Sequence, residues 1–252
     1  MELQKLKFKH QFLQQVDSTN RYAIELLSNI NPNDGFCVIS DFQTEGKGQY
    51  GRSWQSESGK NILSSFIFNT KDKFSSIDHF VLNVIGSIAV YETLSNFIPS
   101  EEIKIKWPND ILIHSKKIAG ILIQNIFRGH ELIWTVIGIG INVNQNHFEN
   151  EHKATSLFQL LSKESDRIDL LQILHDQLMI QFEKLIQGKV PLLYELYNEK
   201  LFGLHQICNL QKANDEIIQG KIRSVDKYGM LSVEIGNKVQ AFDFSSARII
   251  LT

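Results

Sequence analysis

Residues 44–54, TEGKGQYGRSW, combine closely spaced glycines with two cations and a closing tryptophan. The glycines have the spacing G-x-G-x-x-G, which occurs in several unrelated phosphate-binding loops. Glycine lets successive backbone N–H groups point into one concavity, and such a nest attracts anions. Lys47 and Arg52 add positive charge to the same segment. The segment is therefore either an anion-binding loop or a mobile surface loop with incidental charge.

The sequence in and around this loop excludes three common types of phosphate-binding loop. A dinucleotide-binding fold needs the loop to open an apolar helix, whereas this loop continues into the polar segment RSWQSESGKN. A Walker loop needs G-x-x-x-x-G-K followed by Ser or Thr, and the segment does not have that order. A kinase loop would be accompanied by a lysine strand and a catalytic aspartate motif, and the sequence contains neither.

A second cluster, KWPNDILIHSKKIAGIL at residues 106–122, carries several lysines around a sharp turn. Pro108 restricts the backbone of the turn and biases the preceding residue to an extended conformation. Lys106 and Lys117 are compact point charges suited to phosphate, and Asp110 could hold Mg²⁺. A solvated hairpin edge decorated with lysines is the alternative. It does not explain a rigid Trp-Pro-Asn-Asp turn, so we favour a phosphate site.

A third motif is GIGINVN, residues 138–144. Glycines at alternate positions of a strand lie on the same face and leave that face flat. A ring or a purine could lie against such a strip, although a β-bulge or barrel corner would use glycines in the same way.

The elements around these motifs predict an α+β fold. The segments FCVIS (36–40) and NILSSFIF (61–68) are apolar and β-branched, as expected of buried strands. Residues 78–97 have helical apolar spacing. Four further strands at 103–107, 110–114, 117–127 and 131–143 are joined by short links, which suit antiparallel hairpins. We therefore expect a mixed, largely antiparallel sheet with helices on one face.

The chain is expected to contain two domains. Helical spacing occurs at 168–186 and again around 192–201, after which short strands at 216–226, 229–235 and 239–244 alternate with turns. About fifty residues of short strands are typical of a small β-barrel. The predicted boundaries are 1–203 for the main domain and 204–252 for the barrel.

Composition narrows the function classes. The 252 residues include 26 Lys and Arg against 28 Asp and Glu, so the basic excess typical of a nucleic-acid-binding protein is missing. The sequence has neither a secretory signal nor a long apolar span, which predicts a cytoplasmic protein without a membrane segment. Cys37 and Cys208 each lie among apolar residues and are expected to be buried thiols rather than a disulfide.

Together the motifs resemble those of the biotin protein ligases. The matching segments are DSTN (17–20), QTEGKGQYGRSW (43–54), KWPND (106–110), KIAGIL (117–122), GIGINVN (138–144), ATSL (154–157) and the C-terminal strands. The resemblance implies a catalytic domain related to class II synthetases, followed by an SH3-like β-barrel. Family members that repress transcription carry an additional N-terminal helix-turn-helix domain. Only about fifteen residues precede DSTN here, so DNA-binding repression is not expected.

The resemblance also implies a two-step reaction. The carboxylate of biotin attacks the α-phosphate of ATP in the presence of Mg²⁺, and biotinyl-5′-AMP and pyrophosphate form. A lysine of the biotin carboxyl carrier protein of acetyl-CoA carboxylase or a related enzyme then takes the biotinyl group. The family often pairs monomers through the edge of the central sheet, so a homodimer is permitted. A lipoate or octanoate ligase and a non-catalytic biotin sensor are the main alternatives.

The site residues follow from the same resemblance. Lys117 is expected to bridge the biotin carboxylate and the α-phosphate, with Lys106, Asp110 and Lys47 completing the catalytic set. Asp110 could bind Mg²⁺ or orient the incoming amine. The expected biotin contacts, besides Lys47 and Lys117, are Ser18, Thr19, Asn20, Gln43, Gly46, Gly48, Gln49 and Gly120. The expected ATP contacts, besides Lys106 and Lys117, are Arg52, Trp54, Asn109 and Asn142. Trp54 would form a purine wall, with core packing as the alternative.

This chain departs from the family pattern at two of these positions. Many relatives read G-R-G-R where this sequence has Gly46-Lys47-Gly48-Gln49. Lys47 keeps a positive charge without the planar fork of arginine. Gln49 is neutral where relatives often have an arginine associated with retaining the adenylate.

Overall fold

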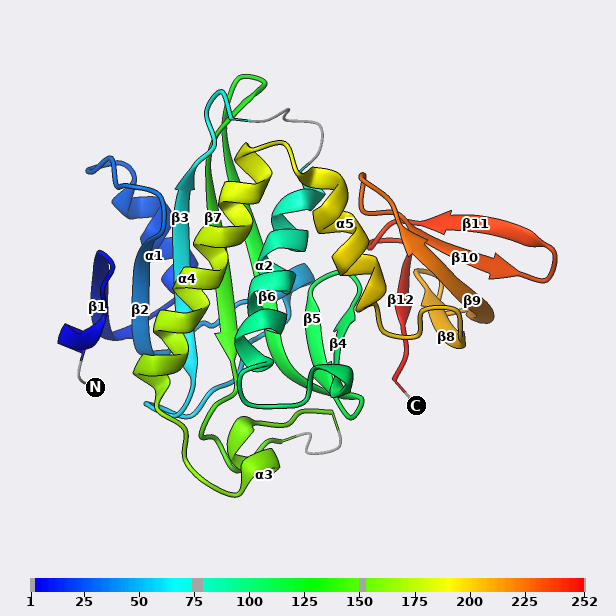
Figure 1. The fold of residues 1–252 in the computed structure, drawn as a ribbon, viewed down its shortest axis with the longest axis horizontal. Coiled ribbons are helices and arrows are strands. Elements are labelled where there is room, and N and C mark those ends of the chain that lie inside the picture. The colour runs from blue at the N-terminus through cyan, green and yellow to red at the C-terminus, as the bar shows by residue number, and fades with distance from the viewer. Residues whose placement is uncertain (1–2, 74–78, 150–152, 252) are drawn as a thin grey trace.

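The computed structural model describes residues 3–73, 79–149 and 153–251 (Figure 1). Its first sheet has seven strands in the order β1-β2-β3-β7-β6-β5-β4. The strands are β1 (His10–Val16), β2 (Phe36–Gln43), β3 (Ile62–Asn69), β4 (Ile103–Lys106), β5 (Asp110–Ile113), β6 (Lys116–Arg128) and β7 (Glu131–Ile141). Strands β1 and β2 are parallel, and every other neighbouring pair of this sheet is antiparallel. The predicted mixed, largely antiparallel sheet is thus confirmed.

Three long helices pack on one face of this sheet (Figure 1): α2 (Phe80–Leu94), α4 (Arg167–Ile186) and α5 (Val190–Glu199). Alternate strand residues such as Cys37, Phe66 and Ile137 contribute to the same main core as these helices. Asp166 caps the N-terminus of α4, and its carboxylate accepts a hydrogen bond from the backbone N–H of Ile168 at 2.7 Å. This part of the chain also contains the short helix α3 (Leu157–Leu161) and 3-10 turns at Leu3–Lys5, Gln49–Gly51 and Ser100–Glu102.

Helix α1 (Thr19–Leu26) lies on the opposite face of the sheet. Its Ala23 packs against Val38, Ile67 and Val136 in a separate small core. Because side chains alternate between the two faces of a strand, these residues point away from the main core. The prediction that helices cover only one face is therefore wrong. Helix α1 and the polar residues at its start share this second face with the glycines of β7.

The C-terminal strands form a second sheet in the order β11-β10-β9-β8-β12. The strands are β8 (Ile207–Lys212), β9 (Ile217–Val225), β10 (Leu231–Ile235), β11 (Lys238–Phe242) and β12 (Ala247–Ile249), and all neighbouring pairs are antiparallel. The predicted small all-β unit is confirmed, with β8 and β12 as strands that the sequence did not indicate. The boundary at residue 203 stays a prediction.

The turn between β9 and β10 is docked against the first domain, beside α5 (Figure 1). The buried indole of Trp107 donates a hydrogen bond from Nε1 to the carbonyl of Gly229 at 2.9 Å. Asn198 of α5 donates to the carbonyl of Val225 and accepts from its N–H. Gly229 has φ +80°, and an added Cβ would lie 2.5 Å from the ring of Phe80. The second sheet is therefore held at one orientation, next to the Trp-Pro-Asn-Asp turn.

Candidate active site

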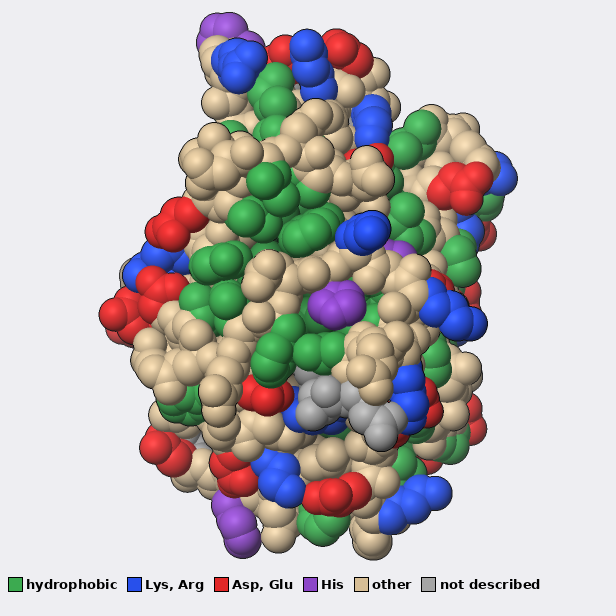
Figure 2. Space-filling view, turned by 90° about the vertical axis from the view of Figure 1, so that its left-hand side faces the viewer, with side chains coloured by type: hydrophobic (Ala, Val, Ile, Leu, Met, Phe, Trp, Pro, Cys, Tyr) green, Lys and Arg blue, Asp and Glu red, His purple; other side chains and the backbone are tan. Residues whose placement is uncertain are grey.

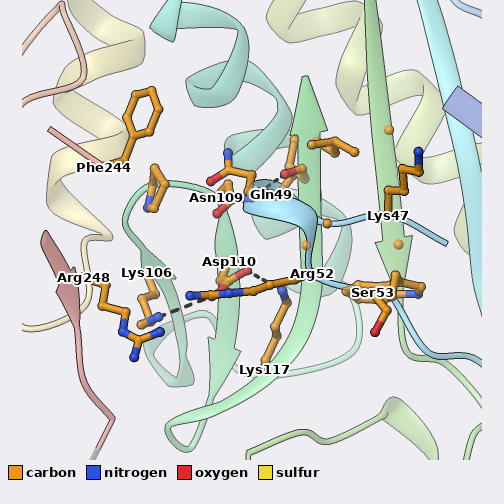
Figure 3. Close-up of a pocket in the computed structure, with 18 of the residues that line it drawn as sticks. Lys47, Gln49, Arg52, Ser53, Lys106, Asn109, Asp110, Lys117, Phe244 and Arg248 are labelled. Atoms are coloured by element: carbon orange, nitrogen blue, oxygen red, sulfur yellow. Dashed lines mark hydrogen bonds and ion pairs between the residues drawn. The ribbon is translucent and has the colours of Figure 1, made fainter. Parts of the chain in front are cut away.

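A cavity of about 410 Å³ lies on the α1 face of the first sheet and extends to the second sheet (Figure 3). Its walls come from the start of α1, the hairpin at residues 46–54, strands β5 to β7, and residues 211–215 and 244–248. The predicted site residues that line it are Ser18, Thr19, Asn20, Gln43, Lys47, Gly48, Gln49, Arg52, Trp54, Lys106, Asn109, Asp110, Lys117 and Gly120. Gly46 and Asn142 are not part of its lining.

One end of the cavity is a network of neutral polar groups. Thr19 donates to Gln43 Oε1 from its backbone N–H at 2.8 Å and from its hydroxyl at 3.0 Å. Asn20 donates from Nδ2 to the carbonyl of Leu122 and accepts from the Ser65 hydroxyl at 2.6 Å. An added Cβ at Gly138 would lie 2.2 Å from Asn20 Oδ1, so glycine is required there. This end can bind a small neutral group that both donates and accepts hydrogen bonds.

The segment at residues 46–54 is a tight hairpin. Trp54 N–H donates to the carbonyl of Gly46 at 2.8 Å, and Gly48 N–H donates to the carbonyl of Arg52 at 2.7 Å. Gly51 has φ +72°, which favours glycine. The N–H groups of Gly48, Arg52 and Trp54 are thus used inside the hairpin. These three N–H groups are not free to bind an anion in this arrangement, and the prediction of an anion-binding loop therefore rests on the remaining N–H groups of the segment and on the side chains of Lys47 and Arg52.

Trp54, which ends this hairpin, lies flat on two neighbouring glycines, Gly140 of β7 and Gly120 of β6, which together form the glycine strip. An added Cβ at Gly140 would be 2.5 Å from Trp54 Cε2, and one at Gly120 would be 3.0 Å from Cζ3. The ring that covers the strip is therefore the protein's own indole. Trp54 is half-buried and does not belong to the hydrophobic core. Its Nε1 is buried without a hydrogen-bond partner among the described residues, and a ligand acceptor could satisfy it.

Next to this indole lies a cluster of charges. Lys117 Nζ is 5.2 Å from the centre of the Trp54 ring and 2.5 Å from Asp110 Oδ1. Lys106 Nζ is 3.7 Å from Asp110 Oδ2. These residues meet because Lys106 opposes Asp110 across β4 and β5, and Asp110 opposes Gly120 across β5 and β6.

The cluster has more positive than negative charge. Burial lowers the pKa of Lys106, Asp110 opposes this shift, and the charges of Lys117, Arg52 and Arg248 lower the pKa further. A bound anion would relieve the mutual repulsion of these cations. The charge pattern therefore fits a phosphate group.

The two asparagines of the predicted nucleotide set make structural contacts. Asn109 Nδ2 donates to the carbonyl of Ile121 at 2.6 Å, on the cavity wall. Asn142 Nδ2 donates to the carbonyl of Thr155 at 3.0 Å. Thr155 N–H in turn donates to the carbonyl of Lys117 at 3.0 Å. Asn142 thus helps to hold the backbone at Lys117 through Thr155, without lining the cavity itself.

Both carboxylate oxygens of Asp110 face lysine ammonium groups, so a Mg²⁺ ion bound by Asp110 would have to displace one of these lysines. Within the described ranges, no cluster of three or more His, Cys, Asp or Glu side chains could hold a metal ion. The alternative role of orienting an amine is compatible with this geometry.

Sequence reasoning missed the cavity residues of the second sheet, among them Gln211, Phe244 and Arg248. It also missed Ser65 in the polar network. A hydroxyl inside the apolar run of β3 was a signal for Ser65, since buried hydroxyls need partners. The residues of the second sheet gave no comparable signal.

The cavity joins a network of neutral polar groups to a cluster of cations, and comparison with known proteins assigns the fold around it to one enzyme family. A model of the biotin/lipoate A/B protein ligase family matches residues 12–142, and the chain belongs to that family. The bifunctional ligase/repressor BirA of Bacillus subtilis is 32% identical over 236 residues, which are 89% of this chain and 69% of that protein. A biotin–[acetyl-CoA-carboxylase] ligase of Mycobacterium tuberculosis is 27% identical over 228 residues, 89% of this chain and 82% of that protein.

Solved structures agree with this assignment. The biotin protein ligase of Aquifex aeolicus, in complex with biotin and ATP, superposes with a TM-score of 0.78 at 25% identity. The match covers 97% of this chain and 99% of the other. It includes both sheets, as the predicted two-part architecture requires.

Proposed function

We propose that this protein is a biotin protein ligase. It activates biotin with ATP to biotinyl-5′-AMP and pyrophosphate, and transfers the biotinyl group to a lysine of a biotin carboxyl carrier protein. Membership of the family, relatives named as biotin ligases, and the Aquifex structure with biotin and ATP support this function.

The observation that carries the proposal is the position of Lys117. Its ammonium is paired with Asp110, and it lies beside Gly120 of the glycine strip. The glycine strip continues along β7 to the neutral polar network around Asn20. Biotin has a neutral ureido ring at one end and a carboxylate at the other. With the ring in the polar network, the carboxylate would reach Lys117 beside the α-phosphate.

The first step needs charge neutralisation rather than a base. A carboxylate with a pKa of ~4.3–5 is ionised at neutral pH, so the nucleophile is already formed. The barrier comes from bringing two anions together, and fixed cations lower it. Lys117 and Lys106 supply those cations here. Mg²⁺ enters as part of the nucleotide substrate, bound mainly by phosphate oxygens.

The second step requires an amine that has lost its proton, since a free lysine has a pKa near ~10.4. Asp110 is the carboxylate of the cavity closest to Lys117, and we assign it the role of orienting the incoming amine. Lys117 engages Asp110 in the absence of ligand. An adenylate phosphate would draw Lys117 away and free a carboxylate oxygen for the acceptor.

The test is ATP–pyrophosphate exchange with Mg²⁺ and biotin, lipoate, octanoate or no acid. Exchange that depends on biotin alone is the expected result, and exchange with lipoate or octanoate would assign the chain to the sister activity. Biotin binding without exchange would indicate a sensor.

Lys117→Ala should abolish exchange without changing the fold. Lys116→Ala is the matched control, because Lys116 neighbours it on β6 but does not line the cavity.

We further propose that the acceptor is the carrier protein of acetyl-CoA carboxylase or a related carboxylase, and that the reaction takes place in the cytoplasm without a nucleic-acid partner. Over the described part of the chain, no helix is long and apolar enough to cross a membrane. Biotinylation of a purified carrier domain, detected by mass spectrometry, tests the acceptor. Failure to label that domain alongside normal exchange would reject this acceptor only.

Self-association through the edge of the first sheet is also proposed. At one edge, Ile105 of β4 already pairs with Lys200 and Phe202, so that edge is partly covered. The other edge strand, β1, carries the half-buried Phe12 and Leu13. Figure 2 views this side and shows hydrophobic side chains gathered across its middle. Light scattering with and without biotin and ATP tests the homodimer, and a monomer under all conditions would refute it.

A further inference from the structure

A buried phenol contacts the Trp-Pro-Asn-Asp turn from the side of the core. Tyr197 of α5 is fully buried and does not line the cavity. Its hydroxyl donates a hydrogen bond to the carbonyl of Pro108 at 3.1 Å. Pro108 itself lines the cavity. The turn therefore lies between the cavity and a side chain that a ligand in the cavity does not reach.

This turn joins two charged residues of the site. Lys106 is the last residue of β4 and Asp110 is the first residue of β5, and they oppose each other across the hairpin (Figure 3). The oxygens of Asp110 lie 3.7 Å from Lys106 Nζ and 2.5 Å from Lys117 Nζ. A displacement of the turn would therefore move the carboxylate relative to both ammonium groups.

The turn is held at three successive residues. Trp107 donates from its indole to the carbonyl of Gly229, and Asn109 donates from its amide to the carbonyl of Ile121. Between them, Pro108 has no N–H, so its carbonyl is the one backbone group through which it can be held. The phenol supplies that hydrogen bond. Without the phenol, the turn could relax at its middle residue.

The hydroxyl of Tyr197 is a permanent donor. Burial raises the pKa of Tyr197 well above its ordinary value of ~10, and the charges of Tyr194 and Asp110 raise it further. The phenol therefore stays protonated at neutral pH. Its ring packs edge-on to Phe80, with 5.9 Å between the ring centres. Core packing accounts for the ring, whereas the hydroxyl either positions the turn or only satisfies its own need for a partner.

We propose that Tyr197 is a positioning residue, which holds the Trp-Pro-Asn-Asp turn so that Asp110 can orient the acceptor amine in the second half-reaction. The inference rests on the proposed function. In that step the amine nitrogen of the carrier lysine forms a bond to the acyl carbon of biotinyl-5′-AMP. The bond from this carbon to the phosphate oxygen breaks, AMP leaves with the electron pair, and the amine releases a proton to solvent. Tyr197 acts through Asp110 and touches neither substrate.

The test removes the hydroxyl and keeps the ring. Transfer of biotin from supplied biotinyl-5′-AMP to a carrier domain reports the second half-reaction directly. A misplacement of about 1 Å costs on the order of 10²-fold in rate, and the hydrogen bonds on either side limit the movement here, so kcat for transfer in Tyr197→Phe should fall by about tenfold. The dissociation constant of biotin should stay within about twofold of the wild type, because the polar network lies on other elements and distant sites act independently.

Tyr194→Phe is the matched control. Tyr194 lies on the same helix, and its hydroxyl also donates to a backbone carbonyl, that of Lys227 at 3.0 Å. Lys227 belongs to the turn between β9 and β10 rather than to the Trp-Pro-Asn-Asp turn. Tyr194→Phe should therefore transfer biotin at the wild-type rate.

A double-mutant cycle with Asp110→Asn separates positioning from a general loss of structure. If Tyr197 acts through Asp110, Tyr197→Phe should add less than about a twofold loss in the Asp110→Asn background. Thermal melting shows whether each variant is folded. Rates are compared at two temperatures well below the melting transition, because a loss that comes from unfolded protein disappears at the lower one.

Transfer at the wild-type rate in Tyr197→Phe, an equal loss in Tyr194→Phe, or a full additional loss in the double variant would overturn the proposal. The hydrogen bond to Pro108 would then serve only to satisfy a buried hydroxyl. Failure of the proposed function itself would look different, because the wild-type protein would then show no biotin-dependent exchange.

Discussion

Replacing Gly140 with alanine tests whether the glycine strip sets the position of Trp54. The new Cβ would lie 2.5 Å from Cε2 and 2.6 Å from Cζ2 of the indole. Carbon atoms in contact are normally about 3.5–4.0 Å apart, so the ring must move by roughly 1 Å. Lys117, whose ammonium is 5.2 Å from the centre of that ring, would lose its platform.

Misplacement of catalytic groups by about 1 Å typically costs on the order of 10²-fold in rate. We therefore expect biotin-dependent exchange in Gly140→Ala to fall by about 10²-fold, which is roughly 2.7 kcal/mol of activation free energy. Stability should change little, because Trp54 is only half-buried and can swing toward solvent. Exchange kinetics and thermal melting measure the two effects separately.

A double-mutant cycle provides the decisive comparison. If the alanine acts by displacing the indole, it should have less than about a twofold further effect in a Trp54→Ala background, because the clash is then absent. A full additional loss in the double variant would show that Gly140 acts through another contact. An unaffected single variant would refute the packing argument itself.

Three other expectations follow from contacts of the structure. Trp107→Phe removes the hydrogen bond to Gly229 and leaves its carbonyl unpaired; we expect a loss of about 1–3 kcal/mol in the free energy of unfolding, measured with urea. Burial lowers the pKa of His175, which stacks on Phe8 at 4.0 Å. The folded state therefore disfavours the protonated ring, and its contribution to stability is complete above the ordinary pKa of ~6.5 and is lost as the pH falls below it. Melting temperatures between pH 8 and 5 should decline less in His175→Gln. The pKa of Lys106 is also lowered, and bound phosphate should raise it. ATP binding at alkaline pH should therefore take up a proton, seen by calorimetry in two buffers and absent in Lys106→Met.

Much of the first sheet could be predicted because its strands have strong local signals. The runs at 36–40 and 61–68 and the hairpins from 103 to 143 appear as strands close to the expected bounds. The prediction that helices cover only one face of the sheet was wrong, although the sequence contained a signal for the second layer. Strands such as FCVIS and SSFIF are apolar on both faces, which indicates a sheet covered on both sides. Val38 and Ile67 are the residues that α1 buries.

The site shows a similar division between local and long-range information. Lys106, Asp110 and Lys117 lie within twelve residues of one another, and hairpin pairing brings them together. Arg248 reaches the same cavity only because the β9–β10 turn docks on Trp107 and α5. No spacing within the C-terminal strands encodes that docking. The hydrogen bonds inside the 46–54 hairpin were equally hidden, since G-x-G-x-x-G does not specify which N–H groups remain available.

The docked turn has a consequence for how the chain unfolds. A ligand that fills the cavity would touch both sheets and act as a reversible crosslink between two units that the backbone joins at a single crossing. Ligand at 100 times its dissociation constant stabilises the state that binds it by about 2.7 kcal/mol. Here that free energy would oppose separation of the sheets as well as their melting. The saturated protein should therefore unfold in one transition, even under conditions in which the free protein loses its C-terminal sheet first.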